Sequence, residues 1–143
     1  MISEIITAIS KRLGAMYADC TVAIDHVEQG LREPCFFIDL LEPSRTPLLG
    51  QRWRQENLFD VQLFDSEAGN VRLYAVAEEL FGGLEYITLQ DGDLLRGTQM
   101  RFTVEDGVLH FFVTYAVILY HRENKECMEI LELEEEVKEA SNG

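Results

Sequence analysis

Residues 101–120 form the segment that most constrains how this chain can fold. They comprise two β-rich runs that meet at Glu105-Asp106-Gly107, in the sequence RFTVEDGVLHFFVTYAVILY, which predicts a hairpin. Successive side chains of a strand point to opposite faces, so the second run places apolar side chains on both of its faces. A strand with one solvent-exposed face would instead alternate apolar and polar residues. We therefore predict that both faces are covered, by other parts of the chain or by another copy of it.

The rest of the chain supplies the elements of an α+β domain. Apolar residues at helical spacing predict a first helix that Ser3 can cap and a second helix from Asn70 to about Phe81. The strands that we expect occupy residues 20–28, 35–41, 52–65, 86–89, 94–105 and 108–120. Residues 42–50 contain two prolines and Gly50, which predicts an exposed loop. The expected fold is a mixed or mainly antiparallel sheet of five or six strands with two helices packed on one face.

Length and charge narrow the class of protein. The 143 residues suit a single α+β domain over residues 1–122, followed by an acidic arm or short helix over residues 123–143. There are 12 basic and 26 acidic residues, and residues 123–143 carry −6 of the net −14 through eight glutamates and two lysines. This excess of acidic residues argues against a protein that binds nucleic acid by neutralising its phosphates. An odd number of cysteines without metal-type spacing, and no apolar run of membrane-spanning length, predict a protein made in a cytoplasm.

The sequence carries no motif that indicates catalysis. It contains no phosphate-binding loop, no nucleophile elbow and no zinc-type spacing, so we predict no enzyme activity, no cofactor and no metal site. The competing interpretation is a small metal-dependent hydrolase built on Asp39, Asp60 and Glu78. Such a site would need a nearby lysine, and the lysines lie only near the two chain ends, at Lys11, Lys125 and Lys138.

Two groups of residues are candidates for a protein interface. Trp and Arg are prominent in protein contacts, which draws attention to Trp53 between Arg52 and Arg54, directly after the predicted loop. The second group consists of Leu94, Leu95, Arg96 and Met100. The alternative for the first group is a core Trp53 flanked by two solvated arginines, and the second group has the same ambiguity.

The chain resembles the phage tail terminator family of long-tailed phages and prophages of Gram-positive bacteria at four segments, EPCFFIDLL, YAVAEEL, LRGTQMRF and DGVLHFFVTY. The resemblance implies a structural subunit of the virion tail that joins others, typically six, in a ring on the head-proximal end of the tail tube. There it would stop tube polymerisation and form the interface to head-completion proteins, after assembly in the host bacterial cytoplasm.

The partners implied by this resemblance are further copies of the chain, the tail tube protein and a head-completion protein. DNA would only pass through the lumen of the ring, where negative walls would repel phosphates, and no membrane contact is expected. The alternative within the same class is a head-to-tail connector or other neck subunit, which could share the size, the acidity and the assembly into a ring.

Overall fold

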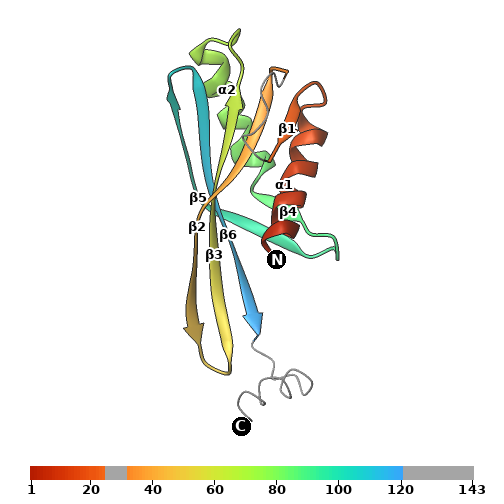
Figure 1. The fold of residues 1–143 in the computed structure, drawn as a ribbon, viewed down its shortest axis with the longest axis vertical. Coiled ribbons are helices and arrows are strands. Elements are labelled where there is room, and N and C mark those ends of the chain that lie inside the picture. The colour runs from red at the N-terminus through yellow and green to blue at the C-terminus, as the bar shows by residue number, and fades with distance from the viewer. Residues whose placement is uncertain (25–31, 121–143) are drawn as a thin grey trace. The chain divides into compact units, whose positions relative to one another are not determined.

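Two helices and six strands make up the part of the chain that the computed structural model describes, residues 1–24 and 32–120. They follow one another in the order α1 (Ile2–Met16), β1 (Thr21–Ala23), β2 (Cys35–Leu48), β3 (Arg52–Phe64), α2 (Asn70–Gly83), β4 (Tyr86–Thr88), β5 (Leu94–Glu105) and β6 (Val108–Tyr120) (Figure 1). The strands form one sheet in the order β1-β2-β3-β6-β5-β4. β1 is parallel to β2, whereas β5 is antiparallel to both β4 and β6. The predicted α+β class with a mixed sheet is confirmed.

The chain divides into two compact units. The larger comprises Met1–Arg45 and Gln55–Val117, and it contains both helices. The smaller comprises Thr46–Arg54, at the tip of the hairpin formed by β2 and β3, and, among the described residues at the end of β6, residues 118–120. The arm or short helix predicted for residues 123–143 lies outside the described residues, and the single domain of residues 1–122 stays a prediction.

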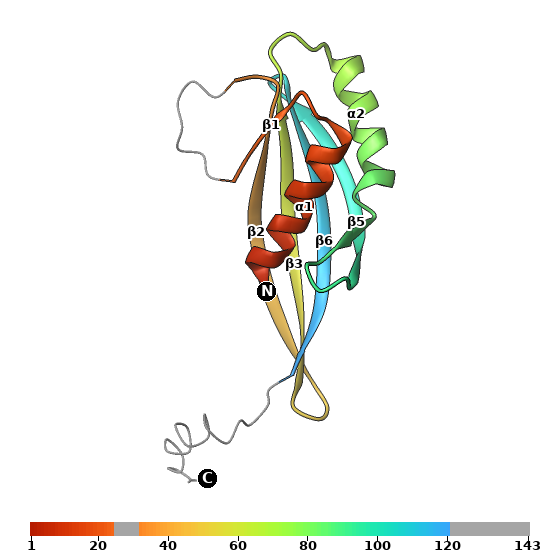
Figure 2. The ribbon, with the colours of Figure 1, turned by 90° about the vertical axis from the view of Figure 1, so that its right-hand side faces the viewer.

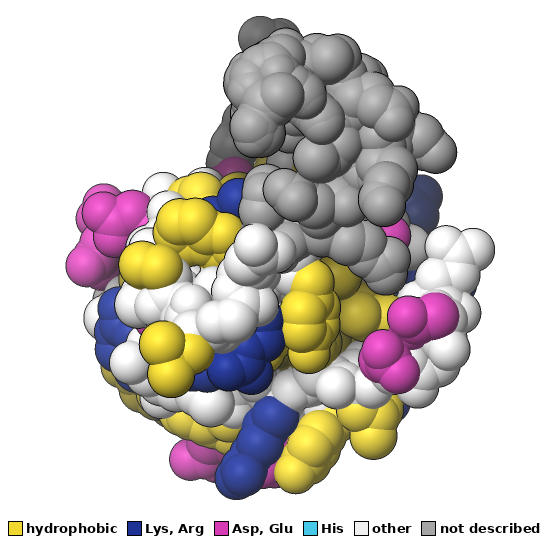
Figure 3. Space-filling model, turned by 90° about the horizontal axis from the view of Figure 1, so that it is seen from below, with side chains coloured by type: hydrophobic (Ala, Val, Ile, Leu, Met, Phe, Trp, Pro, Cys, Tyr) yellow, Lys and Arg dark blue, Asp and Glu magenta, His cyan; other side chains and the backbone are white. Residues whose placement is uncertain are grey.

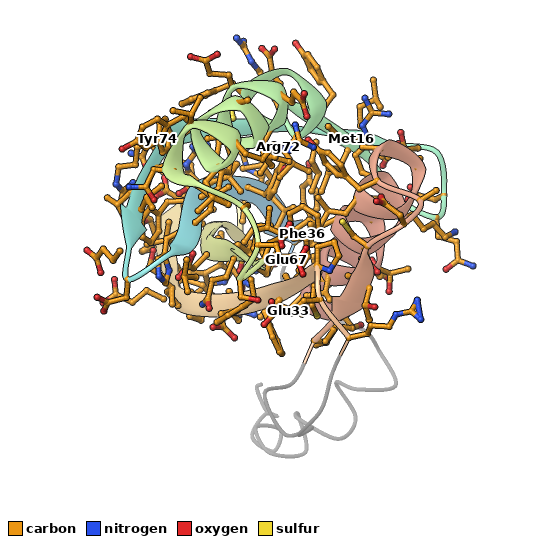
Figure 4. All side chains as sticks on the ribbon, turned by 90° about the horizontal axis from the view of Figure 1, so that it is seen from above. Met16, Glu33, Phe36, Glu67, Arg72 and Tyr74 are labelled. Carbon is orange, nitrogen blue, oxygen red and sulfur yellow. The ribbon has the colours of Figure 1, made fainter. Side chains whose placement is uncertain are left out.

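Both helices cover the same face of the sheet, each through one apolar stripe (Figure 2). Side chains three or four positions apart share one side of a helix, and the buried residues follow that spacing. They are Ile5, Ala8, Ile9 and Leu13 in α1 and Leu73, Val76, Ala77 and Leu80 in α2. Phe36 of β2 points into this core and meets the ring of Tyr17 with centroids 5.3 Å apart (Figure 4). The core therefore lies between the two helices and one face of the sheet.

The end of α2 is capped from α1. We predicted that Ser3 begins α1, but the helix begins at Ile2 after Met1, which makes no side-chain capping bond. The Ser3 carbonyl instead accepts a hydrogen bond of 2.9 Å from the Thr7 hydroxyl. Helix ends leave carbonyls without intrahelical partners, and Arg12 Nε donates to one of these, the Gly83 carbonyl oxygen, at 2.8 Å. This bond ties the two helices together.

The β5–β6 hairpin forms as predicted, with a two-residue turn at Asp106 and Gly107. Both residues have positive φ angles, 54° and 75°, which is the combination that a type I′ turn requires. On β6 one face is buried against the helix side through Leu109, Phe111, Val113, Tyr115 and Val117. The opposite face, which no described helix covers, holds the half-buried Val108, His110 and Phe112 and the buried Thr114.

The prediction of an exposed loop at residues 42–50 is wrong. β2 continues through both prolines to Leu48, and only three residues separate it from β3. The reason lies in β1, whose pairing with β2 covers Cys35, Phe36 and Phe37 and goes no further. Beyond this point β2 is an edge strand among the described elements, and an edge strand tolerates prolines because its outer N–H groups need no partner.

Candidate functional site

The first predicted interface group lies at the hairpin tip, Thr46–Arg54. The chain reverses through Gly50 and Gln51, whose φ angles are 75° and 60°, and Arg52 Nε closes the turn by donating to the Leu49 carbonyl oxygen at 2.9 Å. Leu49 itself is 85 % exposed. Figure 3 looks at this end of the chain, where Lys or Arg side chains in dark blue lie beside hydrophobic ones in yellow. The tip thus offers positive charge and apolar surface together.

Trp53 is neither a core residue nor a fully exposed one. It is half-buried at the start of β3, between the exposed Arg52 and Arg54. A shallow hollow of about 260 Å³ lies against it, lined also by Pro47, Leu48, Gln51 and Arg52. An indole beside an open hollow and a guanidinium is a suitable place for an inserted side chain of another protein.

The second predicted group lies on β5 and extends onto β4. Arg96 pairs in register with Tyr86, its guanidinium lies 5.9 Å from the centre of the Tyr86 ring, and it forms an ion pair of 3.2 Å with Glu85. Leu94 is 62 % exposed and Tyr86 is 50 % exposed. Leu94 lies two positions before Arg96 on β5, so the two side chains share one face of the strand, and we name Tyr86, Leu94 and Arg96 the β4–β5 patch.

Leu95 and Met100 are only half-exposed and lie beside this patch rather than within it. Between Thr98 and Arg101 the pairing of β5 with β6 shifts register, and Gln99 has a positive φ of 55°, so Met100 lies within a β-bulge. The two predicted groups are on different strands, because β6 separates β3 from β5 in the sheet. They make two separate candidate surfaces.

A polar network occupies the sheet face that the helices leave uncovered. Gln62 Nε2 donates to Asp39 Oδ2 at 2.7 Å and to Asp60 Oδ2 at 3.0 Å, and His110 Nδ1 lies 2.9 Å from the same Asp60 oxygen. Asp60 Oδ1 is buried and has no hydrogen-bond partner among the described residues. Burial raises the pKa of the Asp60 carboxyl, and its hydrogen bond to His110 opposes that shift.

The network does not make the metal-dependent hydrolase that Asp39, Asp60 and Glu78 could have formed. Gln62 links Asp39 with Asp60, but Glu78 is exposed on α2, on the other side of the sheet. Among the described residues no group of three or more His, Cys, Asp or Glu could hold a metal ion. Burial also raises the pKa of the Cys20 and Cys35 thiols, the opposite of what a nucleophilic cysteine needs.

The family comparison covers every element described above. The sequence matches the model of the phage tail terminator protein family over residues 4–128, from α1 to beyond the end of β6. The chain belongs to the phage tail terminator family. The comparison with curated proteins gave no match.

This membership gives the terminator a structural role in the phage tail, among other phage tail and head proteins, and a location in the virion tail. Neither described helix is both long and apolar enough to cross a membrane. The β4–β5 patch, the hairpin tip and the polar network all lie within the matched residues.

Sequence analysis missed two features of the terminator. It singled out Arg96 and Leu94 but not Tyr86, because the pairing of β4 with β5 that joins them is not visible in the sequence. It also did not single out His110. The signal that could have found the network is the polar side of the third predicted strand, where Asp60 and Gln62 alternate with apolar residues.

Proposed function

We propose that this terminator caps the head-proximal end of the tail tube, stops tube polymerisation and forms the interface to head-completion proteins. The observation that carries the proposal is the family match over residues 4–128, which includes both candidate interface surfaces. Capping needs no catalysis. One face of the terminator would make the contact that the next tube ring would otherwise make, and the opposite face would offer no site for a further tube ring.

We further propose that the terminator acts as a ring of several copies, with six as the expected number. Exposed apolar residues next to arginines support self-association at the β4–β5 patch, and a cyclic contact between two different surfaces closes into a ring. The other expected partners are the tail tube protein and a head-completion protein. DNA would pass through the lumen without specific binding, which suits a chain with a net charge of −14. Assembly would take place in the host bacterial cytoplasm.

The decisive experiment is the tail-length distribution of a producing phage or prophage from which this chain has been deleted and then restored. We expect overlong tails after deletion, seen by electron microscopy, and tails of normal length joined to heads after restoration. A head-to-tail connector would instead leave tails of normal length without heads when it is deleted. Tails of normal length joined to heads would contradict both roles.

A further inference from the structure

The hairpin tip and the chain that follows β6 carry opposite charges. Thr46–Arg54 contains two arginines and no acidic residue, whereas residues 123–143 contain eight glutamates and two lysines. We propose that the acidic segment of residues 123–143 binds the hairpin tip of the same chain and occupies it in the free subunit. This goes beyond the capping role and does not depend on it.

The position of the chain at the end of β6 favours contact within one molecule. β3 and β6 are neighbours in the sheet, and the Asn57 side-chain amide donates to the Tyr115 carbonyl oxygen across them at 3.1 Å. The last described residues of β6, 118–120, belong to the same compact unit as the tip. Only residues 121 and 122 separate β6 from the acidic segment. A tether this short gives an effective concentration on the order of millimolar.

The two segments also complement each other in apolar surface. The tip exposes Leu49 and the hollow beside Trp53. The acidic segment interleaves its glutamates with five apolar residues that could enter such a hollow, Met128, Ile130, Leu131, Leu133 and Val137. A single exposed ion pair contributes little, so binding would rest on several charges together with apolar contact. It would therefore weaken as salt screens the charges.

Trp53 makes the contact measurable in the full chain, because it is the chain's single tryptophan and lies in the tip. We would compare acrylamide quenching of its fluorescence in the wild type and in a variant with E134Q, E135Q and E136Q. The matched control carries E67Q, E78Q and E105Q, which remove the same charge at exposed sites of the larger unit. We expect a roughly twofold or greater rise in the quenching constant for the first variant and for the wild type at high salt, with the control unchanged at low salt.

A second measurement tests whether the contact is within one chain. A bimane label on Cys127, with Cys20→Ser and with Cys35 unreactive because it is buried, would be quenched by a nearby Trp53. Quenching that is independent of protein concentration and absent in Trp53→Phe is the expected result. Quenching that disappears on dilution would assign the contact to a second copy and overturn the proposal. Equal acrylamide quenching in the wild type and the tail variant, at both low and high salt, would overturn it as well.

Discussion

At the scale of single residues, Asp60 is a carboxyl group whose charged form is disfavoured by burial. Its pKa is raised by burial, so the folded protein holds this proton more tightly than the unfolded chain does. The contribution of the Asp60 proton to folding stability is therefore fully present below the ordinary aspartate pKa. It is lost as pH rises through the raised pKa of the folded protein. Asp60→Asn removes the buried charge, and we expect it to stabilise the protein by about 1 kcal/mol near neutral pH.

This gain should vanish in acid, near the ordinary aspartate pKa of about 3.9, where the wild type is itself protonated. Urea unfolding of both proteins across that pH range measures the difference. Glu78→Gln, at an exposed position, is the control and should leave stability unchanged at either pH. A less stable Asp60→Asn variant at neutral pH would mean that the contacts of the carboxylate with His110 and Gln62 outweigh the cost of burying its charge.

Gly97 is a position in β5 where the neighbouring atoms leave no room for a side chain. A Cβ there would lie 2.7 Å from Val113 Cγ2 and 3.0 Å from the Leu84 carbonyl oxygen. We expect Gly97→Ala to destabilise the protein by about 1–3 kcal/mol through this overpacking, as measured by thermal unfolding. The control is Gly82→Ala in α2, where a Cβ meets nothing within 4 Å and helix propensity predicts a gain of up to about 1 kcal/mol. Equal effects of the two substitutions would refute the packing argument.

At the scale of elements, the hairpin of β2 and β3 ends in a mainly exposed segment. Its tip buries little, so substitutions there should cost the fold less than about 0.5 kcal/mol. We expect Leu49→Asp with Arg52→Glu to retain the wild-type melting temperature but to fail to restore normal tail length in a phage that lacks the chain. Melting curves and electron microscopy of tails measure the two effects.

A matched control for this prediction is available in the larger unit. Val71 is 79 % exposed and Arg32 is also exposed, so Val71→Asp with Arg32→Glu makes the same chemical changes away from the tip. We expect the control to restore normal tails. If the tip variant restored them equally well, the hairpin tip would not be a tail interface.

At the scale of the whole molecule, the β4–β5 patch predicts self-association. Leu94 and Tyr86 expose apolar surface near Arg96, and such patches on soluble proteins commonly mark contacts. We expect Leu94→Glu to shift the protein toward the monomer in light scattering while leaving its fold intact. Val71→Glu is the control and should keep the wild-type mass. A wild type that stays monomeric at every concentration tested would contradict the prediction.

Local patterns were enough to predict most elements of this fold. The β5–β6 hairpin was predictable because Asp106-Gly107 accepts the positive φ angles of its turn, and both helices were predictable from apolar spacing. The loop at residues 42–50 was not, because a proline is compatible with a strand when that strand has an open edge. The short pairing of β1 created this edge, and it joins segments that are distant along the chain.

Most of the elements, the acidity and the membership in the terminator family follow from residue order alone. The face of β6 that the helices cover, and the side chains that meet across the sheet, follow only from the folded arrangement. Asp60 and His110 lie fifty positions apart and reach 2.9 Å because β3 and β6 are neighbours in the sheet. Strand order follows from long-range packing, in which the apolar faces of α1 and α2 pack together on one side of the sheet, and no local pattern encodes that arrangement.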